Sequence, residues 1–325
     1  MLNRRALLGG CLGTLLAARS GVEAQRAGKV HRLGILAVDR SSRFDESFRA
    51  ALQELGYVEE RNLAFERRHT EGRPERVDGF AVELARLEVD AIVATHPAAV
   101  FGARRATATI PIIMVHTPDP VQLGLVATLA RPGGNITGLT SLSVDLSLKQ
   151  LELLKEVVPR ASRIAVLWNP DNPWHPVTVK GLEALQSSLG VRLQIVGVRR
   201  ADDLDSAFRA ITTERVQAVV ILTDPLTFAY RERLADLTLK HRLPTMTGLR
   251  EYAEAGGLMS YWADSDALVR RVASYVDRIF KGARPEAMPI EQPNKYEFVI
   301  NLKTARGLGL TIPPSLLLRA DHVID

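Results

Sequence analysis

Cysteine is almost absent from this sequence of 325 residues, which contains one, Cys11, close to the N-terminus. The chain beyond it can therefore form no disulfide, no cysteine-ligated metal site and no thiol nucleophile. That composition suits an oxidising compartment, where unpaired thiols are a liability. Cysteine chemistry is excluded from the function of everything after residue 11.

The chain also has no concentration of charge of one sign. Its formal net charge is +5, and residues 1–24 contribute Arg4, Arg5 and Arg19 against Glu23, so that 39 basic residues face 36 acidic ones in the remainder. A nucleic-acid binder would gather basic residues on one face or interleave them with aromatic residues. Here they occur as short pairs such as Arg67-Arg68. We expect solvated helix faces and no nucleic-acid partner.

Long hydrophobic runs are missing after residue 24, so no segment there predicts a membrane span. Residues 1–24 have the organisation of a secretory signal peptide: Arg4-Arg5, an apolar run over 6–18, and small residues before Gln25. We expect a soluble exported chain that begins at Gln25. The arginine pair leaves both a twin-arginine and an ordinary signal open. Lipoprotein anchoring at Cys11 is the less favoured alternative, because cleavage there would expose the apolar residues that follow.

The length predicts about two domains, and from residue 31 short β-rich runs alternate with amphipathic helical stretches. This alternation is typical of an α/β fold, with parallel sheets covered by helices. The same order starts again at about residue 148, which predicts two Rossmann-like lobes. The expected helices are 44–55, 75–87, one from near 98, 123–130, 148–158, 177–189, 203–214, 228–241, 267–280 and 304–308. The expected strands are 31–37, 63–67, 91–95, 112–116, 136–139, 164–168, 192–198, 218–222, 244–247, 257–261, 288–291 and 297–301.

The segments after Tyr261 do not fit a simple division into two halves. In clamp-shaped proteins such segments pass back and forth between lobes, which makes the hinge multi-stranded. We therefore expect lobe one to contain residues 30–142 and about 262–290. Lobe two is expected to contain residues 143–261 and about 291–325.

Motifs of the common catalytic sites are absent. The sequence has no G-x-G-x-x-G after a strand, no phosphate-binding loop, no G-x-S-x-G and no H-E-x-x-H. Its seven histidines lack the paired spacing of metal ligands, and a zinc site at His96 and His116 would need a third ligand. We expect no metal, no cofactor and no enzymatic activity. A cleft hydrolase that uses His96 and His116 is kept as an alternative.

Short polar loops follow several of the expected strands. They cover residues 38–41, 95–98 and 117–120 in lobe one, and 169–172 and 223–226 in lobe two. Open parallel sheets bind ligands at the carboxyl ends of their strands. Backbone N–H groups at the following helix starts can hold a carboxylate, and Asp119 and Asp224 suit a ligand ammonium. Each loop alone also fits turn or N-cap chemistry, but their corresponding positions in two lobes favour a binding cleft.

From about Val30 to Ile324, the sequence resembles the ABC transporter substrate-binding proteins of the type I periplasmic-binding-protein fold. The most characteristic blocks are Leu129-Ala130-Arg131-Pro132-Gly133-Gly134-Asn135 and Pro313-Pro314-Ser315-Leu316-Leu317-Leu318-Arg319-Ala320-Asp321. Further matching blocks are 54–58, 70–73, 111–113, 119–121, 136–138, 151–155, 166–170, 254–261 and 298–305.

The resemblance implies a bilobal fold in the periplasm, a monomer that delivers its ligand to an ABC permease in the inner membrane. For some family members it implies an aromatic amino acid as ligand, so we expect a small carboxylate-bearing molecule, an amino acid or aromatic acid. A periplasmic ligand sensor subunit is the alternative. Carried over by position, the ligand contacts would come from Thr95, Ala98, Thr117, Asp119, Asn169, Asp224 and Tyr261. His96 stands where family members often have a small residue, and its imidazole could fill part of the pocket or add a hydrogen bond.

Overall fold

The computed structural model describes residues 29–37, 42–71, 73–141, 143–248 and 250–325. The expected signal peptide, Cys11 and the polar loop 38–41 lie outside the described residues. Within the described ranges, no helix combines the length and apolarity that crossing a membrane requires.

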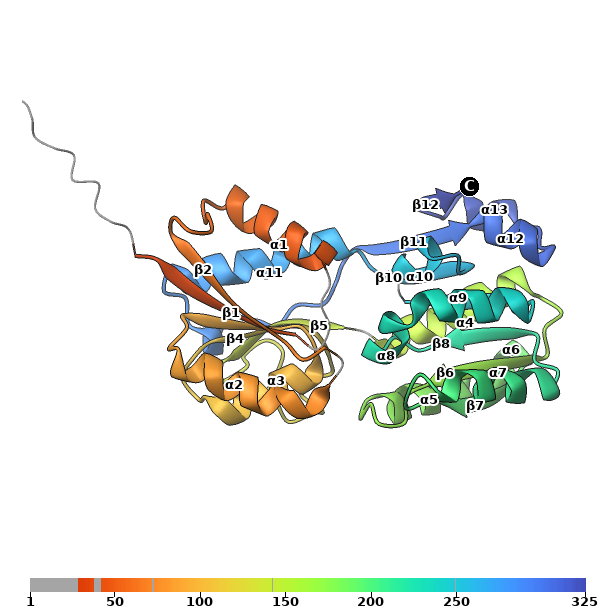
Figure 1. Cartoon of the computed structure of the whole chain (residues 1–325), viewed down its shortest axis with the longest axis horizontal. Coiled ribbons are helices and arrows are strands. Elements are labelled where there is room, and N and C mark those ends of the chain that lie inside the picture. The colour runs from red at the N-terminus through yellow and green to blue at the C-terminus, as the bar shows by residue number, and fades with distance from the viewer. Residues whose placement is uncertain (1–28, 38–41, 72, 142, 249) are drawn as a thin grey trace, which may run out of the picture.

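The first lobe is a parallel sheet between two layers of helices. Its five described strands are in the order β2-β1-β3-β4-β5. Helices α1 and α11 pack against one face and α2 and α3 against the other, above and below the sheet in Figure 1. The elements of this lobe are β1 (His31–Ala37), α1 (Ser42–Glu54), β2 (Leu63–His69), η1 (Pro74–Arg76), α2 (Val77–Arg86), β3 (Ala91–Ala94), α3 (Pro97–Ala106), β4 (Ile112–Pro118), β5 (Ile136–Ser141), α11 (Ser265–Phe280) and η2 (Pro285–Ala287).

Apolar residues on both faces of its strands explain why this sheet is covered twice. In β1, Leu33 and Ile35 belong to the core under α1 and α11, whereas Leu36 belongs to the core over α2 and α3. Alternate residues of a strand point to opposite faces, so a strand that is apolar throughout must be buried on both sides.

The second lobe repeats this arrangement and extends it. Its seven described strands are in the order β12-β11-β10-β9-β8-β6-β7, in which β11 runs antiparallel to β10. Its elements are α4 (Ser143–Val157), β6 (Arg163–Trp168), α5 (His175–Ala184), α6 (Gln186–Leu189), β7 (Arg192–Gly197), α7 (Asp203–Thr213), β8 (Ala218–Ile221), α8 (Pro225–Ala229), α9 (Arg231–Lys240), β9 (Thr245–Thr247), α10 (Arg250–Glu254), β10 (Met259–Ala263), β11 (Tyr296–Asn301), α12 (Leu302–Leu308), α13 (Pro314–Leu317) and β12 (His322–Ile324). The expected fold class, two α/β lobes of mainly parallel strands with a multi-stranded hinge, is confirmed.

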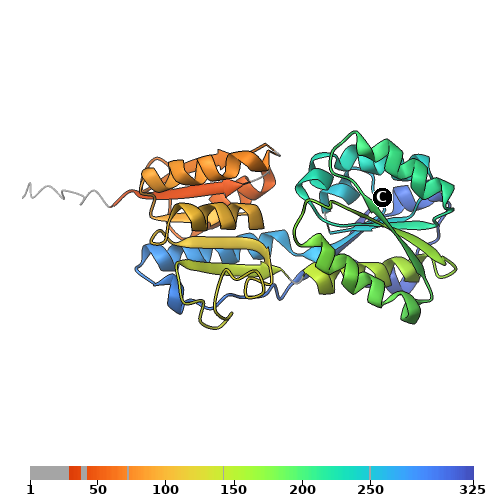
Figure 2. The ribbon, with the colours of Figure 1, turned by 90° about the horizontal axis from the view of Figure 1, so that it is seen from below.

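The chain passes between the lobes three times: from β5 to α4, from β10 to α11, and from η2 to β11. Figure 2 shows the lobes side by side with these connections between them. Helix α11 belongs to lobe one, since its Val272 and Val276 lie in the same core as Leu33 of β1. We therefore propose that the boundaries between the two lobes lie near residues 142, 262 and 291.

Some expected elements are wrong. Residues 123–130 form turns, because Gly124 has φ +64° and the amide of Leu125 reaches back to Pro120. Segment 288–291 is not a strand and contributes one bridge, between Glu291 and Leu139. Pro289 within it has no N–H to donate. The helices expected at 177–189 and 228–241 are each divided in two, and α10, α13 and β12 were not expected.

Candidate ligand-binding site

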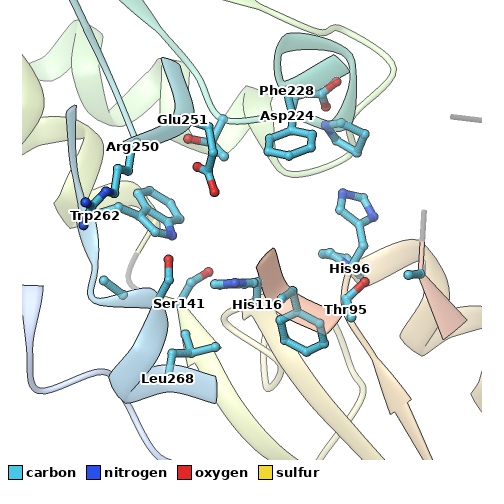
Figure 3. A pocket seen from close by; sticks show the side chains of 18 of the residues that line it. Thr95, His96, His116, Ser141, Asp224, Phe228, Arg250, Glu251, Trp262 and Leu268 are labelled. Atoms are coloured by element: carbon cyan, nitrogen blue, oxygen red, sulfur yellow. The ribbon is translucent and has the colours of Figure 1, made fainter. Parts of the chain in front are cut away.

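A cavity of about 270 Å³ lies between the two lobes. That volume is near the lower end of the range for small-molecule sites. Figure 3 shows side chains of both lobes that surround it. Its lining from lobe one includes Thr95, His96, His116, Ser141 and Leu268, and its lining from lobe two includes Thr223, Asp224, Phe228, Arg250, Glu251 and Trp262.

Strand order explains why the cavity forms here. In each sheet the strand earliest in the chain lies between the second and the third: β1 between β2 and β3, and β6 between β7 and β8. Loops after the strands on either side of such a switch point diverge and leave a crevice. The loops that follow β3 and β8 both line the cavity.

These two loops have the same local structure. Thr95-His96-Pro97 leads into α3, and Thr223-Asp224-Pro225 leads into α8. His96 has φ −149° and ψ 151°, and Asp224 has φ −154° and ψ 151°. Proline is tolerated in the first turn of a helix, where its missing N–H costs no hydrogen bond. The N-cap side chain in turn accepts one of the unpaired amide donors.

Asp224 is a buried carboxylate, with 5% of its surface exposed. Its Oδ1 accepts hydrogen bonds from Asn169 Nδ2 at 3.1 Å and from the amide of Leu226 at 2.9 Å. Its Oδ2 accepts one from Asn172 Nδ2 at 2.9 Å. Among the described residues no cationic side chain pairs with it. A buried charge is costly unless it is paired, so this carboxylate is suited to a positively charged ligand group.

Three histidines at the cavity are held neutral by their surroundings. Burial lowers the pKa of His96 to about 4, with Asp224 opposing the shift and His175 adding to it. Burial also lowers the pKa of His116 to about 4, with a smaller effect of His96. The pKa of His175 is lowered by burial, although Asp224 favours its charged form. At neutral pH these rings contribute hydrogen bonds and contact surface rather than charge.

His96 has a fixed tautomer in this arrangement. Its Nδ1 accepts the amide N–H of Ala98 at 3.2 Å, so the proton of the neutral ring sits on Nε2. Two other polar atoms of lining residues, Thr223 Oγ1 and His116 Nδ1, are buried without a hydrogen-bond partner in the described part of the chain. Such atoms are costly when unsatisfied, and a bound ligand can satisfy them.

Aromatic side chains form much of the apolar wall. Figure 3 shows that Trp262 and Phe228 extend from the second lobe into the cavity, and Phe44 and Trp174 also line it. Aromatic rings of this kind hold flat apolar groups and attract cations over their faces.

The residues expected from the sequence are divided between the cavity and its surroundings. Thr95, His96 and Asp224 line the cavity, and Asn169 lies behind Asp224 as a hydrogen-bond donor. Ala98 donates its amide to His96.

The other three expected residues lie off the cavity in this structure. Thr117 is fully buried, and its carbonyl accepts from Thr140 Oγ1. Asp119 is exposed and accepts the amide of Gln122, so it caps a turn. Tyr261 stacks on Tyr296 with ring centroids 5.9 Å apart. Its neighbour Trp262 lines the cavity instead, because adjacent strand residues point to opposite faces.

Several lining residues were missed in the sequence. Arg250 and Glu251 lie on α10, a short helix that the hydrophobic pattern does not indicate. Phe228 was expected as the first residue of a helix over 228–241, whereas it lies in α8, which ends at Ala229. Trp262 was missed because the expected strand ended at residue 261, whereas β10 continues to Ala263. A strand extended by two residues would have placed Trp262 at its carboxyl end, next to the cavity.

The histidines do not form a catalytic or metal-binding arrangement in the described residues. No group of three or more His, Cys, Asp or Glu side chains there is placed to hold a metal ion. Neither His96 nor His116 forms a hydrogen bond with a described hydroxyl or carboxylate, as His activation of a nucleophile would require. The geometry gives no support to the hydrolase alternative.

Comparison with known proteins agrees with this architecture. The sequence profile of the family described as ABC transporter substrate binding protein matches residues 34–324. A tyrosine-binding protein of Clostridioides difficile is 23% identical over 266 residues, which are 82% of this chain and 76% of that protein.

Two solved structures are similar over most of the chain. The ABC domain from Streptococcus pneumoniae in complex with L-Trp has a TM-score of 0.83 at 25% identity, covering 90% of this chain and 99% of that one. A conserved domain protein from Vibrio cholerae has a TM-score of 0.85 at 26% identity, covering 91% of this chain and 100% of that one. With a profile match across both lobes and the cavity between them, the chain belongs to the family of ABC transporter substrate binding proteins.

Proposed function

We propose that this chain is the periplasmic receptor of an ABC importer and captures a small ligand that carries a protonated nitrogen beside a flat apolar group. The observation that carries the proposal is Asp224, a carboxylate that is buried at the cavity and has no cationic partner among the described residues. Family membership supports the transport role, in which an inner-membrane permease receives the ligand.

The surroundings of Asp224 are organised for an ammonium group. Asn169 and Asn172 each donate to one carboxylate oxygen, which fixes the plane of the group. Hydrogen bonds from an ammonium to a carboxylate are about twice as strong as neutral ones. The aromatic wall that includes Trp262 and Phe228 would hold the apolar body. Aromatic amino acids, which the names of two similar proteins mention, meet both requirements and are the first compounds to test.

Capture would couple to closure of the lobes. A ligand between His96 of lobe one and Asp224 of lobe two contacts both, and it therefore favours the closed arrangement by its additional contacts there. Affinity and closure are then one linked equilibrium.

Native mass spectrometry of the freshly purified protein tests the proposal by identifying a co-purified small molecule. Calorimetric titration of that compound should give at least a tenfold loss of affinity for Asp224→Asn, since a charged hydrogen bond contributes about 1.5–3 kcal/mol. Asp119→Asn is the matched control, because Asp119 also caps a turn but lies outside the cavity. Equal affinity of the two variants would contradict the proposal.

Transport is tested separately, by uptake of the identified compound in cells that lack the gene. Loss of uptake supports the importer. Unchanged uptake with loss of a transcriptional or chemotactic response to the compound would favour the sensor alternative.

A further inference from the structure

We propose that the ligand is a small organic cation without a carboxylate, an aromatic amine rather than an aromatic amino acid. The inference rests on the proposed function and narrows its ligand class. It is carried by an excess of acidic side chains on the described wall of the cavity, where both arginines are already paired with glutamates.

The charged residues of the cavity wall are predominantly acidic. Among the described residues, five carboxylates line the cavity against two guanidinium groups, those of Arg43 and Arg250. The carboxylates are Asp45, Asp224, Glu251, Asp266 and Glu297. A wall with this balance attracts cations and repels anions.

Both arginines are already engaged by glutamates. Arg250 donates from Nε to Glu254 at 2.8 Å and from Nη1 to Glu297 at 2.5 Å. Arg43 Nη1 lies 3.4 Å from the same Glu254. A ligand carboxylate would have to compete with these ion pairs. By contrast, Glu251 has no ion pair among the described residues.

The amides at helix N-termini, a second source of anion binding, are partly engaged within the chain. In α3, Pro97 has no N–H and His96 accepts the amide of Ala98. In α5, the amides of His175 and Val177 donate to Asn172 and Trp174.

The other helices that begin near the cavity carry an acidic side chain at their start. These are Asp45 in α1, Asp145 in α4, Asp224 before α8, Glu251 in α10, and Asp264 and Asp266 at α11. A carboxylate there satisfies the positive end of the helix dipole and leaves little attraction for a second anion.

The other side chains that line the cavity are well suited to a cation. In Figure 3, Glu251, Trp262 and Phe228 all extend from the second lobe into the same space. Aromatic faces and unpaired carboxylates are the groups that recognise organic cations. The unsatisfied Thr223 Oγ1 and His116 Nδ1 can accept hydrogen bonds from ammonium or ring N–H donors.

Matched ligand series test this directly by isothermal titration at pH 7.5. The pairs are tryptamine and tyramine, tryptophan and tyrosine, and indole-3-acetate and 4-hydroxyphenylacetate, which share their rings and differ in charge. We expect the better amine to bind at least tenfold more tightly than either amino acid, and the acids not to bind. Amino acids that bind as tightly as the amines, or no binding by either amine, would overturn the inference.

Two variants separate recognition from folding, provided that their melting temperatures match that of the parent chain. Glu251→Gln should weaken amine binding about tenfold. His96→Ala releases the amide of Ala98 and should raise the affinity for amino acids relative to amines about tenfold. No change in this ratio would count against the role of His96.

Failure of the amine proposal can be distinguished from failure of the proposed function. Tight amino-acid binding that Asp224→Asn abolishes would overturn the present inference and leave the ammonium site at Asp224 standing.

Discussion

His96 and Asp224 occupy equivalent positions in the two lobes and face the same cavity. Each follows a threonine and precedes a proline, and each accepts the amide two residues ahead, His96 at 3.2 Å and Asp224 at 2.9 Å. The difference is in charge, because the ring of His96 is neutral at pH 7 whereas Asp224 is an acid. One architecture thus presents a neutral cap from one lobe and an anionic cap from the other.

We expect the folded protein to become less stable as the pH falls from about 6.5 to about 4. Burial holds the pKa values of His96 and His116 at about 4 in the folded chain, against about 6.5 when unfolded. In this interval the unfolded chain binds protons that the folded chain does not, so the free energy of unfolding decreases. Above pH 6.5 both states are neutral and these groups have no effect. Melting temperatures measured from pH 7.5 to 4.5 would show the decline.

The double variant His96→Gln/His116→Gln should flatten this dependence. His175 and His31 also have lowered pKa values and leave a residual slope. Asp264 and Glu291, whose pKa values are lowered by ion pairs, lose their contribution only below about pH 4. An unchanged slope in the double variant would show that the cleft histidines are not its source.

Trp262→Ala should weaken ligand binding by the folded protein about tenfold. Trp262 lines the cavity, and loss of an aromatic contact to a cation costs on the order of 1–2 kcal/mol. Tyr261→Ala is the counterpart on the other face of β10, where the ring packs against Tyr296 and Phe298. It should lower the melting temperature and leave the affinity of the folded protein unchanged. Titration and thermal unfolding of both variants check this assignment. Loss of affinity in Tyr261→Ala and unchanged affinity in Trp262→Ala would show that the strand faces the other way.

Gly138→Ala should destabilise lobe one by about 3 kcal/mol or more. Gly138 has φ +123°, and a Cβ there would lie 2.2 Å from the carbonyl oxygen of Met114 on the paired strand β4. Gly134→Ala is the control, since its Cβ would meet nothing within 4 Å. Urea unfolding should show a change of less than about 0.5 kcal/mol for the control. Similar stabilities of the two variants would contradict the close approach of β4 and β5.

Glu254→Gln should reduce ligand affinity by less than about threefold. The Arg43–Glu254 contact joins α1 of lobe one to α10 of lobe two at 3.4 Å. Both side chains are more than a third exposed, and such pairs contribute about 0–1 kcal/mol. Glu232→Gln, on α9 and outside the cavity lining, is the control. Titrations at low and high salt would measure the effect, and a loss of more than tenfold would show that the pair is a principal closure contact.

The sequence predicted the parts of the fold that depend on local pattern. Apolar runs such as 91–94 and 218–221 became central strands of the two sheets, because a strand buried on both faces leaves a continuous hydrophobic signature. The segment 123–130 has helical composition, but the left-handed Gly124 and the return of Ile290 to the carbonyl of Leu129 make it a turn region. Contacts from residues so distant in the chain are not visible in a local pattern.

The candidate site was predictable only to the level of loops. Asp119 and Asp224 look alike in sequence, since both precede proline at the end of a strand. Asp224 accepts hydrogen bonds from Asn169 and Asn172 in the adjacent loop of the same lobe, whereas Asp119 accepts the amide of Gln122 three residues ahead. Side-chain direction depends on those donors, which come from distant parts of the chain, and on strand register. Strand register also determines that Trp262 rather than Tyr261 faces the cavity.

Helix α11 has a consequence for the order in which the chain can fold. The hydrogen bond from Tyr57 to Asp277 joins residues 220 positions apart, and α11 covers one face of the first sheet. During synthesis, strands β6 to β10 therefore emerge before the helix that completes lobe one. Contacts of such long sequence separation slow folding, so the lobe that begins later in the chain can assemble its central strands first. A nascent chain that ends before residue 265 would expose the apolar face that α11 covers, and this stage is where we expect aggregation to compete with folding.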